Sequence, residues 1–172
     1  MEYEFETQFK ISSDIRLILN KIKEAHKKAK LDTNFLARAS IEPNSGTLYE
    51  EGHSGPALLK FGIRVNKDYL FTPCLNWVLP DNQKGLSFSA SWKHLNKTRR
   101  MIERFNRDNQ PNNVWWITKS FKLPENMEFI QDEKKSDHYF LTVTEKISSK
   151  QLHDNLLWLA DHMSIIKDVS RS

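Results

Sequence analysis

The sequence predicts an α+β fold: a single domain over residues 1–172, with a mostly antiparallel sheet and helices packed on it. Three observations lead to this prediction. Short segments with period-two alternation recur along the chain, three segments have helical spacing, and turn residues separate the central strands. The predicted order is β-α-β-β-β-α-β-β-α, with one further candidate strand after the first helix. A chain of 172 residues with 38% hydrophobic content can bury a core of this kind.

The N-terminal third is predicted to contain a strand, a helix and a long connection. Apolar and polar residues alternate through much of 3–11, which predicts a half-buried strand. Ser12 and Ser13 then supply a helix cap, and apolar residues at helical spacing predict a helix over 14–31. Over 32–57 the pattern weakens to a candidate strand at 35–41, followed by turns rich in glycine and proline.

Three strands in a meander are predicted next, over 59–65, 69–79 and 86–92. Each has large apolar residues at alternate positions, and Pro73 is expected to mark an edge or a bulge in the second. In the third strand, serines occupy the alternate positions, which is typical of an antiparallel sheet with one face in water.

A basic amphipathic helix and an aromatic strand follow over 94–123. The apolar stripe of this helix is predicted to face the core. It comprises Leu95, Met101, Ile102 and Phe105. In the strand over 114–123, Trp115 and Trp116 point in opposite directions. At most one of the two is therefore expected in the main core, and the pattern leaves open which one.

The C-terminal part is predicted to hold a polar loop over 124–137, a strand over 139–147 and a last helix. Ser148 and Gln151 have capping-box spacing at the start of this helix. Its apolar residues repeat at intervals of four and three, and they are Leu152, Leu156, Leu159, Met163 and Ile166. We expect this face to pack on the sheet, with a dimer seam as the alternative. Trp158 lies outside the stripe and would mark a partner surface if exposed.

The segment from about 58 to 167 resembles the YbjN-like bacterial family, which shares a fold with type III secretion chaperones. The resemblance rests on three strands, a helix ending in an Arg- and Asn-rich turn at 103–107, two strands and a closing amphipathic helix. It implies a non-catalytic binding module, often dimeric, that grips an extended segment of another protein. The chain departs from the family in its N-terminal strand, its long 32–57 connection and its basic charge, because those chaperones are typically acidic.

Positive charge is concentrated in one segment. The chain carries a net charge of +4, and residues 93–122 contain eight basic and two acidic residues, so the remainder is negative. We expect an acidic partner protein, such as a secreted effector or a toxin, and nucleic acid is the alternative. The candidate partner-binding residues are Arg99, Arg100, Arg104, Arg107, Trp116 and Trp158.

No catalytic signature, cofactor motif or metal-ligand cluster is recognisable in the sequence. Cys74 is predicted to be a buried, inert thiol. His53 next to Ser54 is the starting point of an enzyme hypothesis for the 44–56 segment, and Glu133-Lys134-Lys135 matches the E-x-K triplet of some nucleases. Both hypotheses are weaker than that of a binding protein. Adjacent residues such as His53 and Ser54 rarely face each other, and the E-x-K triplet falls in a predicted polar loop.

A cytoplasmic location is expected. No apolar run reaches the roughly 20 residues that a membrane-spanning helix needs. The acidic, alternating N-terminus lacks the plan of a signal peptide, and the single cysteine excludes a disulfide within one chain.

Overall fold

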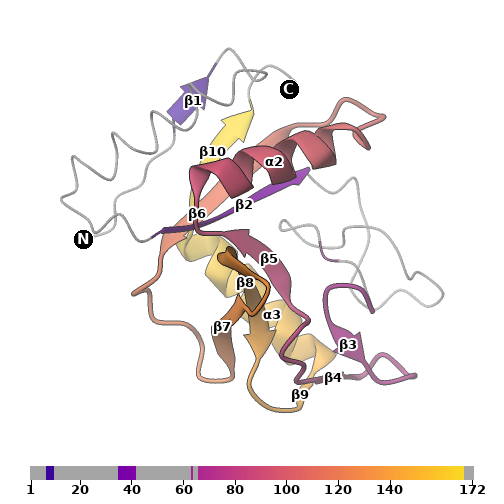
Figure 1. The fold of residues 1–172 in the computed structure, drawn as a ribbon. Helices are drawn as coiled ribbons and strands as arrows, with labels where there is room; N and C mark the ends of the chain where they lie inside the picture. The colour runs from indigo at the N-terminus through magenta and orange to yellow at the C-terminus, as the bar shows by residue number, and fades with distance from the viewer. Residues whose placement is uncertain (1–6, 10–34, 42–62, 64–65, 169–172) are drawn as a thin grey trace. The chain divides into compact units, whose positions relative to one another are not determined.

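The computed structural model describes residues 7–9, 35–41, 63 and 66–168. It confirms the predicted α+β class and the mostly antiparallel pairing of the strands (Figure 1). The described residues form two compact units, each assembled from segments that are distant in the sequence. The first unit contains 7–9, 35–41, 89–121 and 163–168, and the second contains the rest.

The first unit is built on four strands in the order β1-β10-β6-β2, with helix α2 packed against β2 (Figure 1). These elements are β1 (Thr7–Phe9), β2 (Phe35–Ile41), α2 (Trp92–Glu103), β6 (Asn112–Thr118) and β10 (Ser164–Asp168). β6 pairs antiparallel with both β2 and β10, whereas β1 pairs parallel with β10. β6 is therefore an inner strand, and its residues from Asn112 to Ile117 are all buried.

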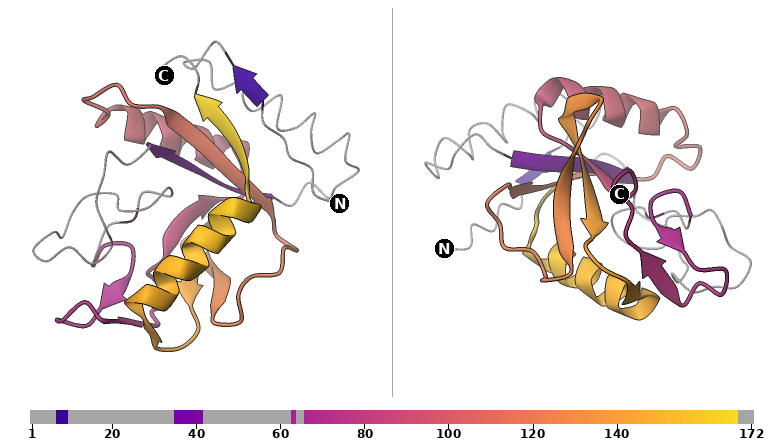
Figure 2. Two further views of the ribbon diagram at one scale, coloured as in Figure 1. Left: turned by 180° about the vertical axis from the view of Figure 1, so that it is seen from behind. Right: turned by 60° about the horizontal axis from the view of Figure 1, so that its bottom comes forward.

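The second unit contains two small sheets, in the orders β5-β8-β7 and β3-β4-β9, together with helix α3 (Figure 2). The strands are β3 (Leu70–Phe71), β4 (Trp77–Leu79), β5 (Leu86–Ser89), β7 (Met127–Asp132), β8 (Lys135–Val143) and β9 (Ile147–Ser148). The last residue of β5, Ser89, belongs to the first unit. Helix α3 spans Ser149–His162.

Side chains from several elements hold the second unit together. The Tyr69 hydroxyl donates a hydrogen bond of 2.6 Å to the carbonyl of Leu141 in β8. Gly85 precedes β5 and lies so close to the Leu141 backbone that a Cβ atom would collide with it. The predicted apolar stripe of α3 is confirmed for its first four members, which are buried: Leu152, Leu156, Leu159 and Met163. Ser148 caps this helix by accepting a hydrogen bond from the Gln151 backbone N–H.

The predicted strand over 69–79 is wrong. The chain turns back within this segment, so that β3 and β4 form an antiparallel pair with Phe71 opposite Val78. Leu75 has a φ of 60° at this turn, and the Thr72 carbonyl accepts the Leu75 N–H at 2.8 Å. Cys74 therefore lies in an exposed turn and not in the core, which corrects the prediction of a buried thiol.

Several other predicted boundaries also change, and the strand predicted over 139–147 is β8 (Lys135–Val143). The third meander strand ends at Ser89, because Ser91 caps α2, and the aromatic strand ends at Thr118. The predicted polar loop contains strand β7, which pairs with β8 although it carries Glu128 and Asp132. The last helix ends at His162, and the chain then continues as strand β10 beside β6.

Several predictions lie outside the described residues. They are the helix over 14–31, most of the strands over 3–11 and 59–65, the turns after 41, and the Ser54 and His53 pair. Within the described part, the candidate strand at 35–41 is confirmed.

Candidate functional site

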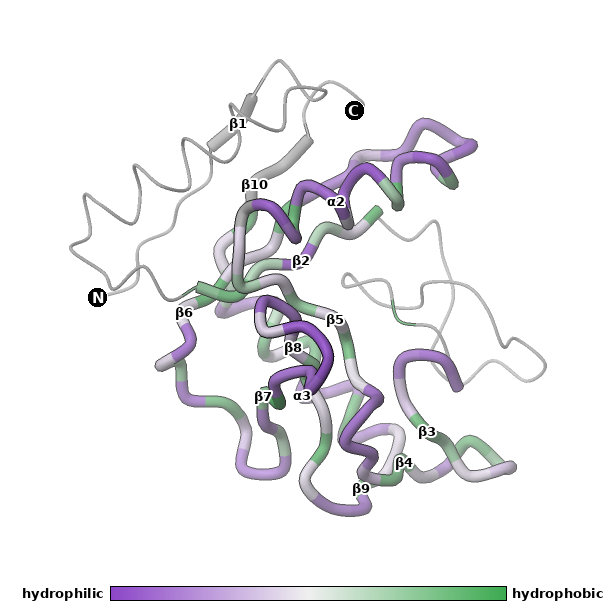
Figure 3. Tube along the Cα trace, in the orientation of Figure 1, coloured by the Kyte–Doolittle hydropathy of each residue, from purple (hydrophilic) through white to green (hydrophobic). Residues whose placement is uncertain are grey.

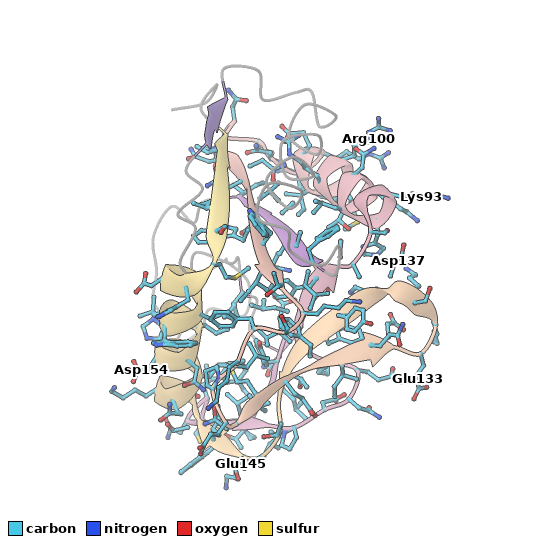
Figure 4. All side chains as sticks on the ribbon, turned by 90° about the vertical axis from the view of Figure 1, so that its left-hand side faces the viewer. Lys93, Arg100, Glu133, Asp137, Glu145 and Asp154 are labelled. Carbon is cyan, nitrogen blue, oxygen red and sulfur yellow. The ribbon has the colours of Figure 1, made fainter. Side chains whose placement is uncertain are left out.

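Helix α2 presents a row of exposed positive charges. Lys93, Lys97, Arg100 and Arg104 are all exposed, and their intervals of four, three and four residues place them on one face of a helix. Arg104 has helical backbone angles as the C-cap, so the row continues to the helix end. We call these four residues the α2 stripe. Lys93 and Arg100 project away from the helix (Figure 4).

Two large apolar side chains lie beside the α2 stripe. Met101 is 52% exposed and Phe105 is 74% exposed, which makes Phe105 the most exposed large apolar side chain in the described part of the chain. Met101 lies in the last turn of the helix, and Phe105 directly follows its C-cap, Arg104. We call the α2 stripe, Met101 and Phe105 together the α2 surface. This surface combines positive charge with apolar area. Most residues of α2 are hydrophilic by their hydropathy (Figure 3).

The local structure fixes the position of this surface. The Ser91 side chain accepts the His94 backbone N–H at 3.1 Å and thereby caps the helix. Leu95 is fully buried and anchors the opposite face. Beyond the helix, the Asn106 side chain exchanges two hydrogen bonds of 2.8 and 2.9 Å with the Gln110 backbone, so the turn that follows Phe105 is held in place.

The α2 stripe is unfavourable for the isolated helix. Like charges three and four residues apart repel each other by roughly 0.2–0.5 kcal/mol per pair. No acidic residue lies in the first turn to offset this repulsion. The Glu103 carboxylate accepts a hydrogen bond from the Asn112 side chain at 3.0 Å and is directed toward β6. An anionic partner would relieve the repulsion and stabilise α2.

Two of the predicted partner-binding residues are buried. Arg99 is 6% exposed and Trp116 is 5% exposed, so the expectation that they reach a partner from the surface is wrong. Arg99 follows Leu95 by four residues and therefore shares its inward face. Trp115 and Trp116 are both buried, because both faces of β6 are covered, which answers the question that the sequence left open.

The other three arginines that were predicted to bind a partner lie at the surface. Arg100, Arg104 and Arg107 are exposed, whereas Met101 and Phe105 were predicted to face the core and do not. The signal that could have identified Met101 and Phe105 as exposed residues is the phase of the helix. Leu95 and Arg99 define its inward face, and Met101 and Phe105 lie well away from it.

Helix α3 has an exposed face of different composition. Trp158 is 42% exposed, as the sequence analysis suggested for a partner surface, and its ring stacks on His162 at 4.1 Å between centroids. Leu157 is also exposed. The α3 surface, as we define it, comprises Lys150, Asp154, Leu157, Trp158, Asp161 and His162. Lys150 pairs with Asp154 at 2.7 Å, and Asp154 projects outward from the helix (Figure 4).

The other groups that the sequence marked for possible chemistry are exposed where the structure describes them. No group of three or more His, Cys, Asp or Glu side chains in this part of the chain could hold a metal ion. The Glu133-Lys134-Lys135 triplet lies at the tip of the β7–β8 hairpin. A hydrogen bond with Thr72 lowers the pKa of the Cys74 thiol, but the described neighbours provide no general base within a shared cavity.

One shallow groove lies on the β7–β8 hairpin. It has an empty volume of about 410 Å³, and its lining includes Asp81, Glu128, Ile130 and Thr142. The Thr142 hydroxyl already donates to the Asp81 carbonyl at 3.1 Å. The groove is open and lacks the enclosed apolar walls that small-molecule sites usually have.

No protein-family model, curated protein or solved structure matches this chain. The resemblance to the YbjN-like family therefore stays a prediction. Within the described residues, no helix is long and apolar enough to cross a membrane.

Proposed function

We propose that this chain is a non-catalytic protein-binding domain that uses the α2 surface to hold an acidic partner protein in the cytoplasm. The partner would present carboxylates to the α2 stripe and an apolar recess to Met101 and Phe105. The observation that carries the proposal is the exposure of Phe105 next to Arg100 and Arg104. Arginine and aromatic side chains contribute most of the binding energy in many protein interfaces.

Charge and apolar area would contribute differently to such binding. The α2 stripe would steer an acidic partner and set its orientation, which mainly raises the association rate. Burial of Phe105 and Met101 would slow dissociation, because each removes a large apolar side chain from water. This division predicts that binding loses only part of its strength at high salt.

Nucleic acid is the less favoured ligand. The aromatic part of that hypothesis relied on tryptophans near the basic helix, and both Trp115 and Trp116 are buried. Among the side chains that the structure describes in α2 and the turn after it, Phe105 is the exposed aromatic ring that could stack on a base. Single-stranded nucleic acid held by the four charges of the α2 stripe and Arg107 would show a salt slope of about −3.5, or roughly a hundredfold loss between 50 and 200 mM salt.

The same surface would serve a chaperone, an adaptor or an immunity protein, each of which covers part of another protein. The YbjN-like resemblance favours the chaperone or adaptor role, and the basic α2 surface suits the blocking of an acidic toxin equally well. The identity of the partner separates these roles.

The test is affinity capture of partners by the full chain after nuclease treatment, followed by binding measurements with the purified partner. Arg100→Glu with Arg104→Glu should weaken binding by at least about tenfold, since two attractive contacts become repulsive. Phe105→Ser should weaken it by about 10- to 100-fold through lost apolar burial. Lys122→Glu with Lys134→Glu is the matched control, because it reverses two exposed charges outside α2.

The proposal fails if binding by the control and by the Arg100 and Arg104 variant is reduced equally. It also fails if nuclease abolishes the capture and single-stranded DNA binds with the steep salt slope expected for phosphate contacts.

A further inference from the structure

The α2 and α3 surfaces have matching spacing and opposite charge. On α3, Asp154 and Asp161 are seven residues apart and exposed, and the exposed Leu157 and Trp158 lie between them. On α2, Lys97 and Arg104 are also seven residues apart, with Arg100 and the exposed Met101 between them. Each helix therefore places two like charges about 10.5 Å apart along its axis, on either side of a hydrophobic residue.

Neither surface suits a two-fold interface with itself. If two α3 helices packed antiparallel about the midpoint of Leu157 and Trp158, Asp154 of one copy would face Asp161 of the other, because both pairs share this midpoint. Two α2 helices would bring the α2 stripe against itself. Like charges in direct opposition are destabilising, so an isologous dimer is disfavoured at either helix.

The two surfaces are complementary to each other. Lys97 and Arg104 of one copy can face the two carboxylates of α3 in a second copy, where Asp154 also pairs with Lys150 of its own helix at 2.7 Å. Met101 then meets Trp158, a contact in which the thioether sulfur interacts favourably with the ring. Arg100 can lie over the same ring as a cation–π partner.

We propose that the α2 surface of one copy docks on the α3 surface of a second copy, in a head-to-tail association. The inference rests on the proposed function because it uses the same α2 surface, and it names the α3 surface of a second copy, with its two carboxylates and exposed apolar side chains, as one occupant. A head-to-tail interface either closes into a ring or extends into larger assemblies as concentration rises. An acidic partner protein would compete with self-association for α2.

A single helix–helix contact buries a small area, which is typical of weak and transient interfaces. We therefore expect weak self-association, which becomes detectable only at micromolar and higher concentrations of the chain. The measurement is sedimentation velocity of the full chain over these concentrations at low and high salt. Self-association should weaken as salt rises, because the charge pairs are exposed.

Complementation between two variants provides the decisive test. Lys97→Glu with Arg104→Glu disables α2, and Asp154→Lys with Asp161→Lys disables α3; all four side chains are exposed, so both variants should fold. Each variant alone should sediment as a monomer. An equimolar mixture should associate, because the intact α3 of the first variant meets the intact α2 of the second and the two charge-reversed surfaces are also complementary to each other. A chain carrying all four changes should regain self-association.

The inference is overturned if the wild-type chain stays monomeric throughout, if the α2 variant associates as the wild type does, or if the mixture contains only monomers. These results leave the proposed function intact provided that the α3 variant still binds the captured partner. Loss of the proposed function would appear instead as unchanged partner binding by the α2 variant.

Discussion

At the residue scale, the phase of helix α2 decides which side chains can meet a partner. Composition suggested that the apolar residues face inward and the arginines outward. Arg99 is buried and Met101 is exposed, so this assumption is wrong for both. An arginine can bury its long aliphatic stem along apolar surface, and helical position then outweighs residue type. The sequence alone does not reveal this, because four apolar residues at 95, 101, 102 and 105 fit more than one inward face.

Substitution of single residues tests this phase. Leu95→Ala should lower the free energy of unfolding by about 2–5 kcal/mol, because it leaves a cavity at a fully buried site. Met101→Ala should change it by less than about 0.5 kcal/mol, because the side chain is half exposed. Urea denaturation of both variants measures the difference. Similar losses for the two variants would contradict the observed orientation of α2.

At the element scale, strands were predicted where alternation was clear and missed where charge obscured it. The strand at 35–41 was predicted with correct bounds. β7 was missed because charged and polar residues surround Phe129 and Ile130, and its pairing with β8 supplies what local propensity lacks. β10 was assigned to the last helix because Ile166 continued the spacing of the apolar stripe. Its actual position beside β6 is a long-range pairing that periodicity cannot show.

The tip of the β7–β8 hairpin carries a carboxylate that responds to pH. A hydrogen bond of 2.8 Å between His138 Nδ1 and Asp132, together with the Lys134 backbone N–H, lowers the pKa of the Asp132 carboxyl. The folded pKa lies below the unfolded value, so this contribution to stability is complete above about pH 4 and is lost as pH falls further.

Asp132→Asn should therefore reduce stability most at neutral pH. The difference in urea midpoint between wild type and this variant should be constant down to about pH 5 and should shrink between pH 4 and pH 3. Glu133→Gln at the exposed tip is the control and should show no such trend. A difference that persists unchanged at pH 3 would exclude a role for the ionised carboxylate.

At the scale of the whole molecule, the α+β class could be predicted from the sequence, whereas the α2 surface could be predicted only in part. Alternation and helical spacing identified an α+β chain because they reflect burial, which operates locally. The concentration of positive charge in 93–122 was also visible, and three of its arginines are exposed. The α2 surface could not be predicted in full, since the exposure of Phe105 depends on where the helix ends and how the following turn is held.

Site-specific photo-crosslinking from position 101 tests the central claim most directly. A photoreactive phenylalanine analogue replaces Met101 in the full chain, produced in its native cells, and the same analogue at Lys122 serves as the control. We predict a crosslinked product from position 101 that resists nuclease, yields peptides of an acidic partner protein, and disappears when Arg100 and Arg104 are changed to Glu. A nuclease-sensitive product, or equal crosslinking from both positions, would contradict the claim that α2 binds a protein.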